Sequence, residues 1–121
     1  MISGIKFFPA IVVLVSVFAT TAGFAADTPA DVKAGATLYR DKGCGFCHGP
    51  ALQGTKKAPA LADIRNDKAW PAGKMTTQIL DGGQKMPPFR DALSDEEIAQ
   101  LVAFLRAKDH PAPPPADPPS H

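Results

Sequence analysis

Residues 44–48 read Cys-Gly-Phe-Cys-His, and the interpretation of the whole chain depends on them. Only two cysteines occur in 121 residues, and they stand three positions apart with a histidine directly behind the second. The other two histidines lie in or beside a proline-rich C-terminal stretch. The function is therefore to be sought in this motif.

The N-terminal stretch has the layout of a secretory signal peptide. A single lysine precedes an apolar run over residues 11–18, and small residues follow. Cleavage after Ala25 suits the small-residue positions, so we expect a signal peptide over residues 1–25 and a mature chain that begins at Ala26. An uncleaved anchor is the alternative, because residues 7–26 carry no charge and are about long enough to span a bilayer.

One small domain is expected between this leader and a C-terminal tail. Residues 109–121 contain six prolines and little to bury, which is typical of an extended, disordered tail. Residues 26–108 remain for the domain, and so short a unit builds only a limited core from its own side chains. Another source of buried apolar surface is needed.

Helix signals stand at both ends of this domain. Thr28 is a suitable N-cap for a helix that runs to about Asp41. Ser94 and Glu97 form a capping box for a second helix over about 95–107. Apolar or small residues recur at helical spacing in both segments, and no part of the chain alternates as a strand would.

The two terminal helices are expected to cross closely at Gly35, with Leu101 or Phe104 filling the gap. A shorter third helix is expected over about 75–81, because Gly82 provides a C-cap at its end. The segments between these helices are long loops, which in a small domain need an organising centre.

Three kinds of site have cysteines at this spacing. A thioredoxin-like dithiol follows a strand in a βαβ unit, which the helical pattern does not provide. A structural zinc site needs further Cys or His ligands, and residues 49–109 contain neither. Covalent attachment of haem needs no other residue nearby and is the usual meaning of Cys-x-x-Cys-His. The sequence therefore favours one haem c bound through Cys44 and Cys47.

The spacing has a chemical reason. Two thiols three residues apart can add to the two vinyl groups on one edge of a porphyrin, which brings the adjacent His48 under the iron. Export fits this reading, because cysteines joined as thioethers cannot be scrambled in an oxidising compartment. We therefore expect a periplasmic protein.

Four motifs follow the order of a known family. They are GCGFCHG at 43–49, Pro-Ala-Leu at 59–61, GGQKMPPF at 82–89 and LSDEEIAQLVAFLR at 93–106. With them, residues 30–107 resemble a class I cytochrome c of the short bacterial monohaem type. The resemblance implies an all-α fold in which three to five helices wrap around the haem, whose apolar mass completes the core.

The same resemblance implies a set of ligands. His48 would be the proximal ligand of the iron, and Pro59 would offer its carbonyl to the far ring nitrogen of His48; a plain loop-breaking role for Pro59 is the alternative. Met86 would be the distal ligand rather than an apolar gap-filler, because two prolines after it stiffen the loop. Met75 is the other candidate for that position.

These expectations describe a carrier of single electrons between periplasmic or membrane redox partners, and not an enzyme. Histidine and methionine together close the iron, and the thioether raises its potential. We expect a monomer with no membrane span after leader removal, no nucleic-acid partner, and a dehydrogenase, an oxidase or another cytochrome as partner. The alternative is a haem enzyme or gas sensor with an open or labile distal position.

Charge suggests how a partner would dock. The sequence carries 13 basic and 12 acidic side chains, but residues 40–90 hold nine Lys or Arg against four Asp, and residues 91–121 hold two against six acids. Five lysines near the motifs are expected to ring the haem edge, the alternative being solvated charges with no shared face: Lys42, Lys56, Lys57, Lys74 and Lys85.

Overall fold

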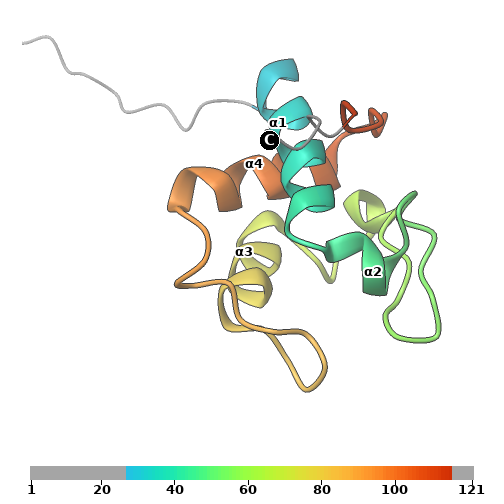
Figure 1. Ribbon diagram of the computed structural model, residues 1–121, viewed down its shortest axis with the longest axis vertical. Coiled ribbons are helices and arrows are strands. Elements are labelled where there is room, and N and C mark those ends of the chain that lie inside the picture. The colour runs from blue at the N-terminus through green and yellow to red at the C-terminus, as the bar shows by residue number, and fades with distance from the viewer. Residues whose placement is uncertain (1–26, 116–121) are drawn as a thin grey trace, which may run out of the picture.

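The computed structural model describes residues 27–115, and the predicted signal peptide lies outside them. Within these residues the fold is all-α, as predicted, and contains no strand. None of the described helices is both long enough and apolar enough to cross a membrane. The elements, coloured along the chain in Figure 1, are α1 (Pro29–Asp41), α2 (Cys44–His48), the 3-10 turn η1 (Ile64–Asn66), α3 (Ala72–Asp81) and α4 (Asp95–Arg106).

Side-chain caps start α1 and α4. Thr28 accepts a hydrogen bond from the backbone N–H of Asp31, while the Asp31 carboxylate accepts one from the backbone N–H of Thr28, both at 3.1 Å. Ser94 and Glu97 form the same reciprocal pair, at 3.2 and 2.8 Å. Each pair satisfies two backbone donors that a helix leaves unpaired, so the first turn is fixed by the sequence itself.

The third helix starts earlier than predicted. α3 begins at Ala72, because Pro71 adopts an extended conformation before it and its carbonyl accepts from the N–H groups of Lys74 and Met75. Met75 therefore lies inside the helix and not at its start. The C-terminal end agrees with the prediction: Gly82 follows the helix with a φ of 69°.

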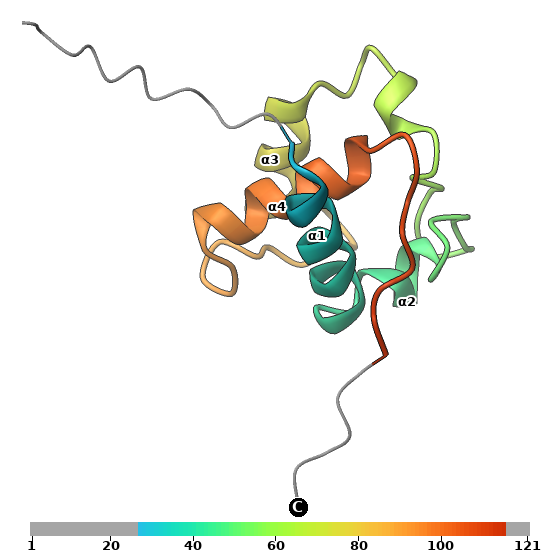
Figure 2. The same ribbon diagram turned by 90° about the horizontal axis from the view of Figure 1, so that it is seen from above.

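Helices α1 and α4 cross closely in both views (Figures 1 and 2). A Cβ placed on Gly35 would lie 2.1 Å from the carbonyl oxygen of Gln100 and 2.6 Å from the Cβ of Phe104. The predicted crossing at Gly35 is thus present, with Phe104 and the Gln100 backbone as the nearest groups. Ridge-into-groove packing at this distance is possible only where one helix has no side chain.

The core lies where α1, α3 and α4 meet, and α4 is its centre. Ile98 and Leu101 of α4 are each 2% exposed, and Tyr39 of α1 packs its ring against Phe104 with 5.5 Å between centroids. Met75, also 2% exposed, belongs to the same cluster. Three helices therefore share one continuous apolar interior.

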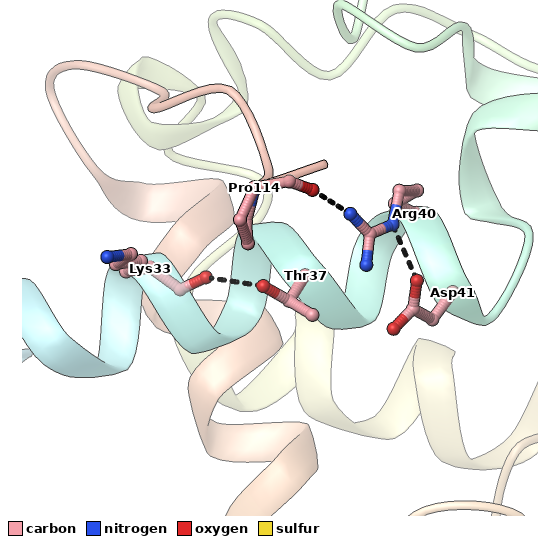
Figure 3. Close-up of polar contacts among 5 residues, drawn as sticks. All are labelled: Lys33, Thr37, Arg40, Asp41 and Pro114. Carbon is pink, nitrogen blue, oxygen red and sulfur yellow. Dashed lines mark hydrogen bonds and ion pairs between the residues drawn. The ribbon is translucent and has the colours of Figure 1, made fainter. Parts of the chain in front are cut away.

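The first part of the proline-rich tail lies against α1 and α4. Figure 2 shows the chain turning back after α4, and the ring of His110 packs edge-on against Phe104 at 5.2 Å. The guanidinium of Arg40 donates to the carbonyl of Pro114 while its Nε pairs with Asp41 at 2.6 Å (Figure 3). The sequence did not suggest these contacts. Disorder in the rest of the tail stays a prediction, because residues 116–121 lie outside the described part.

Gly35→Ala is expected to lower the free energy of unfolding by about 1–3 kcal/mol, because the added methyl group would overlap the backbone of α4. Chemical denaturation of the purified protein measures this value. Gly73→Ala is the matched control, since a Cβ at Gly73 has no neighbour within 4 Å. Equal stability of the two variants would show that the helices do not meet as closely as described.

Candidate cofactor-binding site

The Cys-x-x-Cys-His motif forms a helix of its own. α2 is five residues long, and Gly43 and Gly49 bound it with φ values of 76° and 86°. Both lie in the left-handed region, which glycine adopts without a steric cost. The chain thus enters and leaves α2 by sharp turns, and Cys44, Cys47 and His48 are presented on a single turn of backbone.

Neighbouring segments hold the carbonyl groups at the end of α2. The Thr55 hydroxyl donates to the carbonyl of Cys47 at 2.5 Å, and the Tyr39 hydroxyl donates to that of Gly49 at 2.8 Å. The His48 carbonyl accepts from the backbone N–H of Gly54, at 2.7 Å. Burial raises the pKa of the Tyr39 hydroxyl, so it remains a donor throughout the neutral range.

The imidazole of His48 is oriented by the loop that follows. Its Nδ1 lies 2.8 Å from the carbonyl oxygen of Pro59, the contact that the resemblance implies. A carbonyl only accepts, so Nδ1 carries the proton and Nε2 keeps a free lone pair. Such a partner fixes the tautomer and ring orientation of a metal-binding histidine. The geometry therefore suits ligation through Nε2.

All three motif side chains line one cavity of about 1130 Å³. Its walls come from α2, the loop around Pro59, α3 and the loop that contains Met86. Burial raises the pKa of the Cys44 thiol, which is protonated at neutral pH. The size lies just above the range of about 300–1,000 Å³ usual for small-molecule and cofactor sites, so the cavity can take a large ring system.

The donor set of the cavity fits haem c. Two thiols and an imidazole come from a single turn of α2, and apolar residues such as Leu61, Ile79 and Phe89 line the remaining wall. In the described part of the chain, no three side chains of the His, Cys, Asp and Glu types are grouped as around a bound metal ion. The cavity thus matches the attachment of a flat, apolar macrocycle better than a structural zinc site.

Both candidate methionines line this cavity, but in different settings. Met75 is 2% exposed and belongs to the core. Met86 is partly buried on the loop after α3, and it packs against the edge of the core. A position on the cavity wall therefore does not by itself distinguish them.

A sequence model of the family described as "Cytochrome C oxidase, cbb3-type, subunit III" matches residues 30–105. This span is more than half of the chain. The chain belongs to this family of c-type cytochromes. It is a small class I cytochrome c whose cofactor is a covalently bound haem c, which confirms the expectations for family, fold and cofactor.

Solved structures of other c-type cytochromes resemble this cytochrome. The c-type cytochrome KustC0563 is 29% identical, with 60% of this chain and 93% of that chain covered and a TM-score of 0.53. Cytochrome CL from Methylophaga aminisulfidivorans MPT is 28% identical, covering 66% and 55%, with a TM-score of 0.55. The c-type cytochrome XoxG from Methylobacterium extorquens AM1 is 24% identical, covering 74% and 61%, with a TM-score of 0.55.

The likeness to XoxG speaks for the fold alone, and the cytochrome spans just over half of cytochrome CL and about three fifths of XoxG. No curated protein sequence matches it significantly.

Three residues of the site are not evident from the sequence. Tyr39 has a core position in the helical pattern, and nothing in that pattern indicates that its hydroxyl reaches Gly49. Thr55 and Gln78 are single polar residues without a motif, although each bonds a carbonyl beside the cavity. Their partners are close in space only after the loops have folded, so sequence spacing carries no signal of them.

Replacing Cys44 or Cys47 with Ala is expected to weaken or abolish retention of the haem, and folding with it, because the macrocycle contributes much of the buried apolar surface. Mass spectrometry of the purified protein measures covalent haem, and circular dichroism measures helix content. Phe46→Ala is the control, since Phe46 stands between the cysteines but is 84% exposed. Full covalent loading of both cysteine variants would contradict the assigned attachment.

Proposed function

We propose that this cytochrome carries single electrons in the periplasm, with His48 as proximal and Met86 as distal ligand of the haem iron. The observation that carries the proposal is that the attachment turn and Met86 line the same cavity from different segments of the chain. Cys44 and Cys47 form the thioethers, and the Pro59 carbonyl orients His48. Members of the family are electron-transfer proteins, which agrees with this role.

Met86 is favoured over Met75 by the way each residue is held. The carbonyl of Met86 accepts from the N–H of Gly83 at 2.9 Å, which closes the loop on itself, and the N–H of Phe89 donates to the carbonyl of Ile79 at 3.1 Å, which ties the far end of the loop to α3. Pro87 and Pro88 further restrict the loop before folding, which reduces the entropy lost when the sulfur binds. Met75, by contrast, is needed as core packing.

Closure of the iron separates a carrier from a haem enzyme. A haem with axial histidine and methionine has a raised potential, and its iron has no open position for a substrate or gas. The chain then has three tasks: to hold His48 in one tautomer, to keep the Met86 thioether in place, and to exclude water with the apolar wall. None of these tasks makes or breaks a covalent bond of the protein. The haem can therefore gain and lose an electron while the chain stays chemically unchanged.

The proposal includes the organisation of the chain. Residues 1–25 direct export, residues 26–108 form the haem domain, and residues 109–121 form the tail. A monomer is proposed, with a dehydrogenase, an oxidase or another cytochrome as redox partner. The description of the matched family names an oxidase, which makes an oxidase one of the candidates.

A basic rim supports docking of an acidic partner at the cavity. The lysines that line the cavity are Lys42, Lys56, Lys57 and Lys85. Asp63 and Asp67 also line it, so four basic groups face two acidic ones. The fifth predicted lysine, Lys74, lies 4.2 Å above the ring of Trp70, which is itself part of the cavity wall. An excess of one charge sign around the cofactor steers a partner of the other sign.

Exchange of each methionine for leucine tests the distal ligand. Met86→Leu is expected to keep covalent haem, lower the reduction potential and allow carbon monoxide to bind the ferrous form, because it removes the thioether at nearly constant volume. Met75→Leu is the matched variant and is expected to stay closed. Redox titration and absorption spectra with carbon monoxide measure both. If Met75→Leu alone allowed carbon monoxide to bind the iron, Met75 and not Met86 would be the distal ligand. If the unaltered protein already bound carbon monoxide readily, the haem enzyme or gas sensor would be favoured.

Association with an acidic redox protein is expected to slow by about tenfold or more as ionic strength rises from about 0.01 M to 0.15 M, where the Debye length falls from about 30 Å to 8 Å. Stopped-flow mixing measures the rate. Lys57→Glu, on the rim, should reduce the rate at low salt more than Lys33→Glu, an exposed site on α1 that does not line the cavity. Rates that do not change with salt would exclude electrostatic docking at the rim.

A further inference from the structure

We propose that Gly82 and Gln78 are positioning residues for Met86, and that together they set how firmly the distal side is closed. The inference rests on the proposed ligation by Met86. Neither residue has a ligating role in it: Gly82 has no side chain, and Gln78 acts through its hydrogen bond to the backbone. Both lie at the junction between the end of α3 and the loop that carries Met86.

The backbone of the loop that carries Met86 packs directly against Gly82. Its φ is 69°, and an added Cβ would lie 2.4 Å from the Met86 carbonyl oxygen and 2.8 Å from backbone atoms of both Pro87 and Pro88. Real Cβ atoms essentially never come this close to such groups. The groups in contact belong to Met86 itself and to the two stiff residues after it, so the loop cannot absorb a methyl group by moving a flexible side chain.

Gln78 fixes the backbone on both sides of Gly82. The N–H of Gly82 donates to the carbonyl of Gln78 at 2.8 Å, and the Gln78 side-chain amide donates to the carbonyl of Gly82 at 2.9 Å. One residue therefore holds the two peptide groups that flank the turn. Because Gln78 is part-buried and lines the cavity, water replaces this bond poorly if the amide is lost.

The hydrogen bond that closes the Met86 loop depends on the orientation of the peptide group between Gly82 and Gly83. The N–H of Gly83 donates to the Met86 carbonyl at 2.9 Å, and that bond closes the short loop over Gly82. Rotation of the peptide group between Gly82 and Gly83 would aim this N–H elsewhere and release Met86. The chain of contacts thus runs from Gln78 through Gly82 and Gly83 to the backbone of the proposed ligand.

The test compares Gly82→Ala, Gln78→Leu and Gly73→Ala in the haem-loaded protein, with Met86→Leu as the reference for a fully open distal side. Gly73→Ala adds the same methyl group near the start of α3, where a Cβ meets nothing within 4 Å, whereas Gly82 directly follows the end of this helix. Each variant is measured for covalent haem, helix content, reduction potential and the fraction of ferrous protein that binds carbon monoxide at one fixed concentration.

Gly82→Ala is expected to keep covalent haem and helix content while its potential and carbon monoxide binding move toward those of Met86→Leu. Gln78→Leu is expected to raise the equilibrium constant for carbon monoxide binding by about tenfold, as the loss of one poorly replaced hydrogen bond would. Gly73→Ala should match the parent. A purely structural role would lower thermal stability without moving the potential or opening the iron.

If Met86→Leu opens the iron but Gly82→Ala and Gln78→Leu keep the potential and closure of the parent, the positioning inference is wrong and the proposed function stands. If Met86→Leu itself leaves the iron as closed as in the parent, the ligand assignment fails instead. Should Gly82→Ala yield no loaded protein, Gln78→Leu decides, because it requires no strained backbone.

Discussion

The backbone of Gly35 lies against the carbonyl of Gln100 and the Cβ of Phe104, and both walls of the cavity depend on this approach. α1 leads within three residues into the attachment helix α2, and α4 packs on α3, from which the Met86 loop extends (Figure 1). Because the first and last helices are locked together, segments distant in sequence face the same interior. A side chain on α1 at this position would separate the helices and with them the proximal and distal walls.

The proximal wall, formed by α2 and the loop after it, is held together by hydrogen bonds to the backbone carbonyl groups at the end of α2. α2 is too short to satisfy its own carbonyl groups, and the loop after it has no regular structure up to η1. Each of the last carbonyls therefore takes a donor from another segment: Thr55, Gly54 and Tyr39. Pairing of this kind removes the cost of unsatisfied polar groups and leaves the loop few alternative conformations. The orientation of His48 follows from this order, because the Pro59 carbonyl that it bonds belongs to the same loop.

Features with a local pattern in the sequence could be predicted. The caps at Thr28 and Ser94 act through neighbours a few residues away, and the Cys-x-x-Cys-His motif acts through known chemistry. The crossing at Gly35 is a contact between distant segments, but the helical spacing of small residues on one helix and bulky residues on the other already indicated it. The predicted start of α3, at about residue 75, is too late, because the helix begins directly after Pro71, whose carbonyl accepts its first hydrogen bonds. The roles of Thr55 and Gln78 and the contacts of the tail depend on tertiary approach, which has no fixed spacing in the chain.

The proximal and distal walls hold their proposed ligands by different physical means, and this difference decides which residues can adjust the closure and the reduction potential of the iron. On the proximal side, covalent attachment and a network of carbonyl acceptors leave His48 little freedom, so changes there affect loading and folding together. On the distal side, the proposed bond to Met86 competes only with release of a short loop, whose cost is set by two prolines, one glycine turn and one amide. Substitutions at a few residues that never touch the iron can then adjust its closure and its reduction potential while the attachment motif stays unchanged. The distal loop is therefore the segment in which substitutions would convert a closed electron carrier into an open, reactive haem protein.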